Sequence, residues 1–465
     1  MKYVLDEDIM RSNFFVGNSF RHANGNCFRL FPFNTTNSEV KSLKNALGMW
    51  ICCLKGKKVE CNNFDEVLEK LYSEANVDAD PKEKFEEIVA SLFWDDEKKL
   101  KPNSIVTMQF VETDNKIEER IALYLYSVLG NPDTQKLIIH KAESASQNHA
   151  NVLEKVISDV LVKNTSDLEV SDKVFQTIAS SPAGVFSDDL TYIVENPTRT
   201  KEYLLQLLEF YYFFYTAQTT LLLEQFENGS RQEIVPLYFS LDWEKTSKAR
   251  ECYTRGWNIL QRAIQNQFCH AITLEILNQN TLAKKYDYIS LKEYCNEHPD
   301  ELDEMCNTIS KLITIYRDAI IGMSSNTEKA EFDTVRKEES YGPVFAEIHY
   351  LFDSIKNQFD NSVRGGANKR YIDYFTSFCR ENFLKHRGQS GLMLNISEEL
   401  LIFLTRLAIK DQDQMSLNEV FIQFEKRGVF LDRISKEEVV KFYSKLNLID
   451  KKSDSGDAQY VKRIL

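Results

Sequence analysis

The chain has 465 residues, of which 43% are hydrophobic and 12% aromatic, and this composition excludes a disordered protein and predicts two or three folded domains. Only 16 glycines and 9 prolines are present, a scarcity of helix breakers that favours long helices over a turn-rich β fold. The formal charge of −13 argues against a protein coated in nucleic acid. The charge is uneven, because residues 361–465 hold 18 basic against 14 acidic side chains, so a mildly basic tail follows an acidic body.

Residues 1–35 are expected to be extended. The stretch RSNFFVGNSFRHANGNCFRLFPF alternates aromatic and polar side chains around Asn24-Gly25, a pair that favours the turn of a β hairpin. We therefore predict a small N-terminal β element packed on the body. The opening MKYVLDEDIM has no basic segment followed by an apolar run, so a secretory signal is not expected.

Helical periodicity dominates from residue 36 onward and predicts a mainly α fold. We expect helical domains at residues 36–240 and 241–360, followed by a basic hinge and a C-terminal domain at residues 361–465. The segments with helical periodicity are 38–54, 64–75, 81–94, 117–129, 151–162, 171–179, 200–226, 244–278, 290–297, 300–321, 342–360 and 369–385.

The predicted helix 200–226 contains an apolar run as long as a membrane span needs, ~20 residues. It also contains Glu209, and a charged side chain near the centre of a bilayer costs ~2.5–3.5 kcal/mol. We therefore expect no membrane span, but a helix that is buried in the core or docks a partner. The aromatic residues that would dock a partner are Phe210, Tyr211, Tyr212, Phe213, Phe214 and Tyr215.

The nine cysteines are scattered, and no two have C-x-x-C spacing. This pattern is typical of reduced thiols in a cytoplasmic protein. Cys295, His298 and Cys306 come nearest to a metal-binding pattern, but a fourth ligand is missing, so no metal is predicted.

The last 70 or so residues show three helix-capping signals. Ser397 precedes an apolar stripe, Ser416 and Ser435 each have a glutamate three residues later, and Gly428 ends the middle helix. Two extended segments, LNLIDKK and AQYVKRIL, follow. Three short helices and a hairpin are the order of a winged helix, in which the third helix enters the major groove and the hairpin contacts the adjacent backbone.

The SDSGD loop between the two extended segments has one glycine, and no helix follows it, so it does not fit a phosphate-binding loop. Gly456 is expected at the turn of the hairpin. No phosphate-binding loop, H-E-x-x-H or G-x-S-x-G pattern occurs elsewhere, so no catalytic residue and no cofactor are predicted. A nuclease site made of scattered carboxylates stays an alternative.

Basic side chains surround the predicted third helix, and each one near a phosphate would release a counterion and steepen the salt dependence of binding. Glu437 and Glu438 dilute this charge, so a solvated face or a protein-docking module is the alternative to DNA contact. Gly365 and Gly366 could let the backbone approach a phosphate or could form a flexible hinge. The predicted DNA contacts are Arg364, Lys369, Arg370, Arg387, Lys426, Arg427, Arg433, Lys436, Lys441, Lys445, Lys451, Lys452, Lys462 and Arg463.

The segment FEKRGVFLDRISKEEVVKFYSKLNLIDKKSDSGDAQYVKRIL resembles the G component of the DNA phosphorothioation-dependent restriction system, the DptG/DndG family. The resemblance is carried by F-E-x-R-G at residues 424–428, the SDSGDAQYV tail and the aromatic EFYYFFYTAQ helix, and the length and the MKYVLDEDIMRSNFF opening are also similar. None of these is a catalytic signature, and the family offers no catalytic residue to carry over.

The resemblance implies a role in antiviral defence. The bacteria concerned replace a non-bridging phosphate oxygen of their DNA with sulfur, and a complex of three proteins attacks DNA without that mark. ATP-driven functions are assigned to the F and H components. This chain would then be a non-catalytic scaffold that binds duplex DNA and docks those ATPase partners, alone or as an oligomer within the complex. A metal-dependent nuclease and a winged-helix transcription regulator are the alternatives.

Overall fold

The computed structural model describes most of the chain, and the statements below concern that part. The described residues are 3, 5–16, 19–36, 40–59, 64–75, 82–95, 100–101, 104–111, 113, 115–148, 152–162, 165–170, 175–280, 282, 284–322, 342–451 and 459–464.

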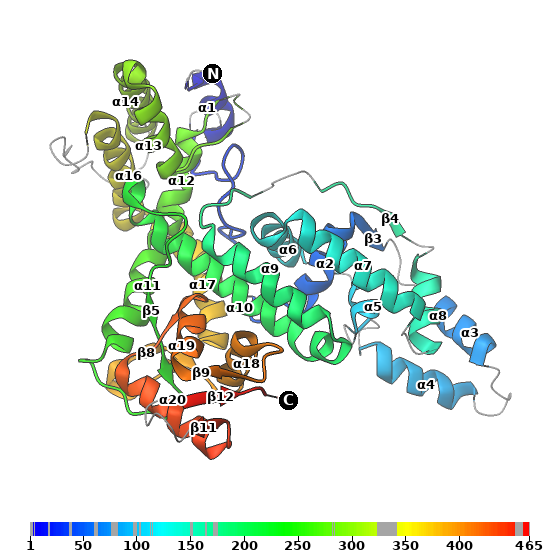
Figure 1. Cartoon of the computed structure of the whole chain (residues 1–465). Helices are drawn as coiled ribbons and strands as arrows, with labels where there is room; N and C mark the ends of the chain where they lie inside the picture. The colour runs from blue at the N-terminus through cyan, green and yellow to red at the C-terminus, as the bar shows by residue number, and fades with distance from the viewer. Residues whose placement is uncertain are drawn as a thin grey trace.

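The fold is mainly α, as the composition predicts, and its longest helix, α10 (Pro197–Leu223), runs through the centre of the molecule (Figure 1). Asn196 caps this helix, because its side chain accepts the backbone N–H groups of Thr198 and Arg199. Beyond its first turns almost every side chain of α10 is buried. None of the described helices combines the length and the apolar character that crossing a membrane requires.

The aromatic run of α10 is the centre of the main core rather than a docking surface. The predicted docking residues are at most 3% exposed, so this prediction is wrong: Phe210, Tyr211, Tyr212, Phe213, Phe214 and Tyr215. Two of the rings pack on α17 (Gly365–Asn382) and on the residue that follows it: Tyr212 lies 4.8 Å from Phe378 in a T-shaped pair, and Phe213 lies 4.3 Å from Phe383 in a stacked pair.

Helices from the first half of the chain pack beside α10 (Figure 1). They are α2 (Lys44–Lys55), α5 (Ile105–Met108), α6 (Lys116–Leu129), α7 (Pro132–Asn148) and α9 (Ser181–Val194). The sequence patterns did not predict α7 or α9. In turn, the helix expected at 171–179 is absent from residues 175–179, which are extended or irregular.

Three helices form a small separate core at one end of the molecule (Figure 1). They are α3 (Phe64–Ala75), α4 (Lys82–Phe93) and α8 (Val152–Val162), and we call them the satellite helices. Their core includes Val67, Phe93 and Ile157 and is distinct from the one around α10. Strands β3 (Lys57–Val59) and β4 (Thr165–Asp167) pair antiparallel beside them.

A second group of helices packs beyond the other end of α10. They are α11 (Asn258–Ile264), α12 (Gln267–Leu277), α13 (Tyr288–Glu297), α14 (Leu302–Ile321) and α16 (Pro343–Asn361). The single helix expected at 244–278 is broken by a π-helical turn at Tyr253–Trp257. Gly256 has non-helical angles there, and a Cβ at this position would lie 2.5 Å from the carbonyl oxygen of Tyr238, so the close approach of the backbone requires glycine.

The N-terminal segment forms α1 (Glu7–Phe14) and a hairpin of β1 (Phe15–Val16) and β2 (Ser19–Phe20). Residues 7–14 are therefore helical, where extended structure was predicted, and the hairpin that is present does not turn at Asn24-Gly25 as predicted. Residues 25–28 instead wrap around the buried carboxylate of Glu275, which accepts their four backbone N–H groups at 2.7–3.2 Å. The positive φ of Gly25, 82°, makes this loop possible.

The last third of the chain turns back onto the body. Two parallel strand pairs join it there, β5 (Leu237–Tyr238) with β10 (Val429–Phe430) and β6 (Ser240–Leu241) with β8 (Leu392–Ile396). The remaining elements are β7 (Leu384–His386), α18 (Glu398–Ile409), β9 (Gln414–Ser416), α19 (Leu417–Glu425), α20 (Arg433–Lys445), β11 (Ile449–Lys451) and β12 (Gln459–Lys462).

Residues 397–464, which we call the C-terminal module, share the main core with α10. Strands β9, β12 and β11 form an antiparallel sheet with β12 in the middle. Ser397 and Ser416 cap α18 and α19 as predicted, but Asp432 and not Ser435 caps α20. The expected turn at Gly456 lies outside the described residues. Gly365 and Gly366 form the first turn of α17 and not a flexible hinge.

Candidate nucleic-acid interface

The outer face of α20 is the most exposed basic surface among the predicted DNA contacts. Arg433, Lys441 and Lys445 are all exposed. Lys441 and Lys445 follow Arg433 by eight and twelve residues, both multiples of four, so the three side chains lie along one side of the helix. Arg433 has an 82% exposed side chain, and Lys441 a 65% exposed one. We call this row, together with Lys436, the α20 face.

Glutamates of the module balance part of this charge. Arg433 pairs with Glu437 at 2.6 Å, and Lys441 pairs with Glu438 at 2.6 Å, which raises the pKa of Lys441. Lys436 pairs with Glu425 on α19 at 3.1 Å. Surface pairs of this kind are worth ~0–1 kcal/mol each, so a phosphate can compete with the glutamates for these cations.

Other basic residues of the module are also exposed. Lys426 and Lys462 lie outside α20, and like Lys445 at its end they form no ion pair with any described residue. Arg463 is exposed at the end of β12. The side chains of Lys451 and Lys452 lie outside the described residues.

Arg427 was predicted to contact DNA, and the structure contradicts this prediction. Its side chain is 2% exposed and forms a bidentate pair with Asp189 of α9, at 2.7 and 2.6 Å. The same carboxylate accepts a hydrogen bond from Tyr211 at 2.7 Å and pairs with Lys410 at 3.2 Å. Arg427 therefore anchors the C-terminal module to the body.

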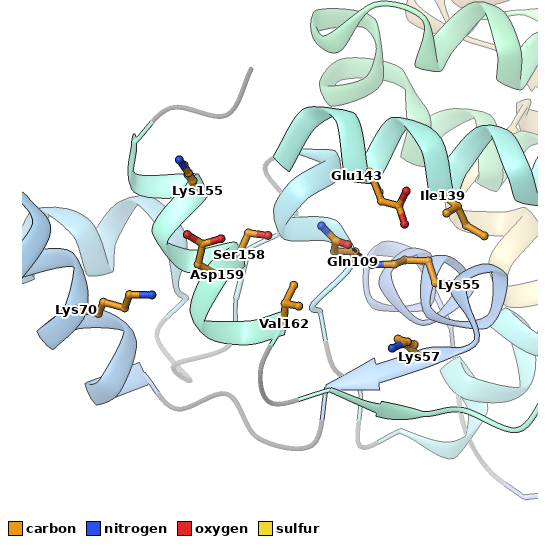
Figure 2. Close-up of a pocket in the computed structure, with 11 residues that line it drawn as sticks. Lys55, Lys57, Lys70, Gln109, Ile139, Glu143, Lys155, Ser158, Asp159 and Val162 are labelled. Atoms are coloured by element: carbon orange, nitrogen blue, oxygen red, sulfur yellow. Dashed lines mark hydrogen bonds between the residues drawn. The ribbon is translucent and has the colours of Figure 1, made fainter. Parts of the chain in front are cut away.

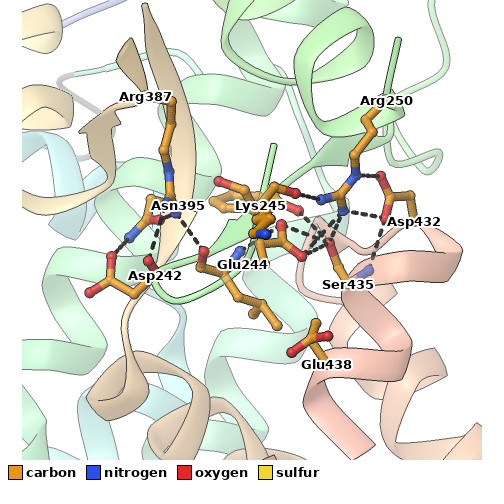
Figure 3. A network of polar contacts seen from close by, with 12 residues as sticks. Asp242, Glu244, Lys245, Arg250, Arg387, Asn395, Asp432, Ser435 and Glu438 are labelled. Carbon is orange, nitrogen blue, oxygen red and sulfur yellow. Dashed lines mark hydrogen bonds and ion pairs between the residues drawn. The ribbon is translucent and has the colours of Figure 1, made fainter. Parts of the chain in front are cut away.

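Arg387 is likewise used inside the molecule and not at a DNA surface. Its guanidinium donates to the carbonyl oxygen of Asp242 at 3.0 Å and to Asn395 Oδ1 at 2.6 Å (Figure 3). Lys385 pairs with the carboxylate of Asp242 at 2.8 Å. These bonds fasten β7 and β8 to the turn after β6.

The other predicted contacts lie on or directly before α17, which packs mainly on α11, α12 and α16. Arg364 is half-buried before the first turn of α17, Lys369 is exposed, and Arg370 donates to the carbonyl oxygen of Thr35 at 2.6 Å. The structure does not bring these three residues together with the α20 face.

A buried polar network holds the N-terminus of α20 against the body (Figure 3). Arg250 forms two hydrogen bonds to the carboxylate of Asp432, at 3.0 and 2.6 Å, and one to Glu244 at 3.2 Å. Ser435 donates to Glu244 at 3.0 Å and accepts from Arg250 at 2.8 Å. Burial opposes the charge of Asp432, but the bonds from Arg250 and the Ser435 N–H outweigh it and lower the pKa of Asp432.

Sequence reasoning missed this network because its members are far apart in the chain. Arg250 and Asp432 are 182 residues apart, and each looks like an ordinary surface residue in its own segment. The one available signal was the N-cap position of Asp432 before α20, which the serine at 435 obscured.

No protein-family model matches the chain, and no curated protein matches it at a significant level. Within the described residues, no group of three histidine, cysteine or acidic side chains is placed to hold a metal ion. Its biochemical role must therefore follow from its own surfaces.

Proposed function

We propose that this chain is a non-catalytic scaffold subunit of a bacterial DNA phosphorothioation-dependent restriction complex, and that its C-terminal module is a winged helix that sits against duplex DNA. The observation that carries the proposal is the exposed α20 face on the third helix of that module. The restriction system and its F and H ATPase partners are proposed from the family resemblance, and the exposed α20 face supports the proposed DNA contact.

The order of elements supports the winged-helix interpretation. The module runs α18, β9, α19, β10, α20, β11 and β12, and β12 lies between β9 and β11 in the sheet. Strand β10 pairs with β5 of the body, and apart from it the order is one helix, one strand, two helices and two strands. In helix-turn-helix proteins of this kind the last helix enters the major groove. Here that helix is α20, and its free side carries the basic row.

The rigid attachment of the module supports a scaffold role. Arg427–Asp189 and Arg250–Asp432 are both buried and join the module to α9 and to the turn after β6. DNA bound to α20 would therefore have a fixed orientation relative to the body. Because α10 is buried, we propose that the ATPase partners dock on the outside of the acidic body and not on the aromatic helix.

A salt titration of duplex binding by the full chain tests the DNA contact. Each phosphate contact adds about 0.9 to the slope of log K against log salt, so Lys441→Gln with Lys445→Gln should reduce the slope by about 1.8 and weaken binding similarly for all sequences. Both lysines are exposed, so folding should not change. Deleting the module is a poor test, because it would expose the core around α10.

The matched control is Lys116→Gln with Lys311→Gln, which removes two exposed lysines on α6 and α14. We expect this control to bind duplex like the unmodified chain. An unchanged slope in the Lys441/Lys445 variant would remove α20 from DNA contact and favour a protein-docking role for the module. Co-purification of an ATPase with the full chain tests the scaffold role separately.

A further inference from the structure

A cavity of about 780 Å³ lies where the satellite helices meet the main body (Figure 2). Its walls come from both cores. Lys70 of α3 and Lys155, Ser158 and Asp159 of α8 form one side, whereas Lys55, Gln109 and Glu143 form the other. The volume is in the range of small-molecule sites, ~300–1,000 Å³.

Four lysines line this cavity, against two carboxylates. They are Lys55, Lys57, Lys70 and Lys155, and the carboxylates are Glu143 and Asp159, so the formal charge of the lining is +2. None of the four lysines forms an ion pair with a described carboxylate, although two carboxylates share the cavity. This differs from the α20 face, where glutamates already pair with three of the cations.

Lys55 is the most informative of the four, because it is partly buried without a counterion. Its amine donates to Gln109 Oε1 and lies 5.9 Å from the centre of the Phe110 ring. Burial lowers the pKa of Lys55. The carboxylate of Glu143 on α7 favours the charged amine but forms no ion pair with it. An ammonium group held partly away from water without an ion pair is costly unless an anion completes its environment.

The fold gives the lysines fixed positions. Lys55 is the last residue of α2, and Lys57 is the first residue of β3. Gly56 between them has a φ of 65°, and the chain turns there from the helix into the strand. Lysine amines are strong point-charge partners for phosphate. Ile139, Ala142 and Val162 supply an apolar side to the same cavity.

We propose that this cavity binds a small molecule that carries a chain of phosphate groups, with the phosphates held by Lys55, Lys57 and Lys70. A free nucleotide and inorganic polyphosphate share this chemistry. The site holds the ligand without reacting with it, and because it bridges the satellite helices and the body, bound ligand would fix one against the other. The inference is independent of DNA contact by α20.

Calorimetric titration of the full chain with ATP and with inorganic triphosphate tests the proposal. We expect at least one of them to bind, and Lys55→Gln with Lys70→Gln to weaken that binding by about tenfold or more, which corresponds to ~1.4 kcal/mol. The Lys116→Gln, Lys311→Gln control should bind unchanged. Tighter binding of ATP identifies a nucleotide and use of the apolar side, whereas equal or tighter binding of triphosphate identifies polyphosphate.

Two results would overturn the proposal. One is the absence of binding by both probes at millimolar concentration. The other is binding that the Lys55/Lys70 variant retains in full. Should Lys55→Gln fail to fold, Lys70→Gln with Lys155→Gln replaces it with the same expectation; Lys70 is half-buried and Lys155 is exposed. A 5′-phosphorylated oligonucleotide that binds in a lysine-dependent way, when neither small probe binds, would assign the cavity to nucleic acid instead and would also overturn the proposal.

Discussion

The C-terminal module and the satellite helices are both attached to the body around α10, but by opposite means. The module shares the main core, and two buried arginine–carboxylate pairs cross its boundary. The satellite helices have a core of their own, and lysines that form no ion pair with a described residue line a cavity at their boundary. Charged side chains therefore form buried ion pairs where the module meets the body, but line a cavity where the satellite helices meet it.

This difference indicates which joint is built for position. A buried ion pair adds little net stability over apolar packing, but breaking one leaves an uncompensated charge, so such pairs favour one arrangement of the parts that they join. The α20 face is thus held in one orientation. The satellite joint has no such pair among the described residues that line its cavity, and a ligand can supply the missing anion there.

Breaking the Asp189 site should have the largest effect on stability. Asp189→Ala leaves Arg427 buried without its carboxylate and removes the partner of Lys410 and Tyr211. We expect the free energy of unfolding to fall by about 3–5 kcal/mol, measured by urea denaturation. A loss below about 1 kcal/mol would mean that the pair does not anchor the module.

The double variant Asp189→Leu with Arg427→Met tests whether the loss in Asp189→Ala comes from the unpaired charge of Arg427. Because it removes both charges and keeps apolar volume, it should recover most of the stability lost in Asp189→Ala. Asp159→Ala at the satellite joint is the contrasting control, since this exposed carboxylate forms no ion pair with a described residue. We expect it to change stability by less than about 0.5 kcal/mol.

Gly428 is the next position in expected effect, because it joins the module to the aromatic helix. It has a φ of 73°, and a Cβ there would lie 2.5 Å from Cε2 of Phe214. Gly428→Ala should therefore cost about 2–4 kcal/mol in urea unfolding, from backbone strain and overpacking together. Gly388→Ala has a similar φ, 52°, but open space around it, so only the strain of ~1 kcal/mol is expected.

The Arg250 network should make the module joint sensitive to acid. Asp432→Asn keeps an oxygen that caps α20 but loses the charge facing Arg250, and we expect a loss of about 1.5–3 kcal/mol at pH 7. The folded-state pKa of Asp432 is lowered, so its contribution exists above the unfolded pKa of ~3.9 and disappears as the pH falls through the folded value. The difference between variant and unmodified chain should shrink from pH 5 to pH 3.

Glu244→Gln gives the matched test with the opposite sign. Burial raises the pKa of Glu244 and outweighs the bonds from the Leu241 N–H and Arg250. Its folded state binds a proton more readily than the unfolded chain, so the unmodified protein gains stability relative to Glu244→Gln as the pH falls. If the stability difference from the unmodified chain shrinks with falling pH for both Asp432→Asn and Glu244→Gln, the two carboxylates titrate as one site.

Most helices with an apolar face and a local cap were predictable, but α1 was not: Asp6 caps it and Met10 and Phe14 are buried, yet its segment was expected to be extended. The predicted segment 64–75 coincides with α3, and Ser397 and Ser416 cap the helices that they were expected to start. Helices α7 and α9 were missed because their apolar pattern is irregular, and α9 begins without a side-chain cap. The π-helical turn at Tyr253–Trp257 depends on contact with Tyr238, which no local pattern contains.

The charged residues show why the candidate sites were harder to predict. Arg427 and Lys441 are both basic residues near α20, yet one is buried against Asp189 and the other is exposed. The difference depends on a partner 238 residues away. The lysines of the satellite cavity come from three separate segments of the sequence. Only Lys55 and Lys57 are close together in the sequence, so no local pattern shows that all four lysines line one cavity.

The smallest global effect is expected from a cavity in the satellite core. Val156 is 1% exposed there, and Val156→Ala removes two methyl groups, a loss of ~1–2 kcal/mol. If the satellite helices are a separate unit, hydrogen exchange should quicken in α3, α4 and α8 by about tenfold and stay unchanged in α9 and α10. Leu204→Ala in α10 is the reciprocal control, which should quicken exchange in α9 and α10 and leave α3, α4 and α8 unchanged. If Val156→Ala instead quickens exchange equally in the satellite helices and in α9 and α10, the two cores open together. The satellite helices would then be held to the body as firmly as the module, and the cavity would not lie at a joint between separate units.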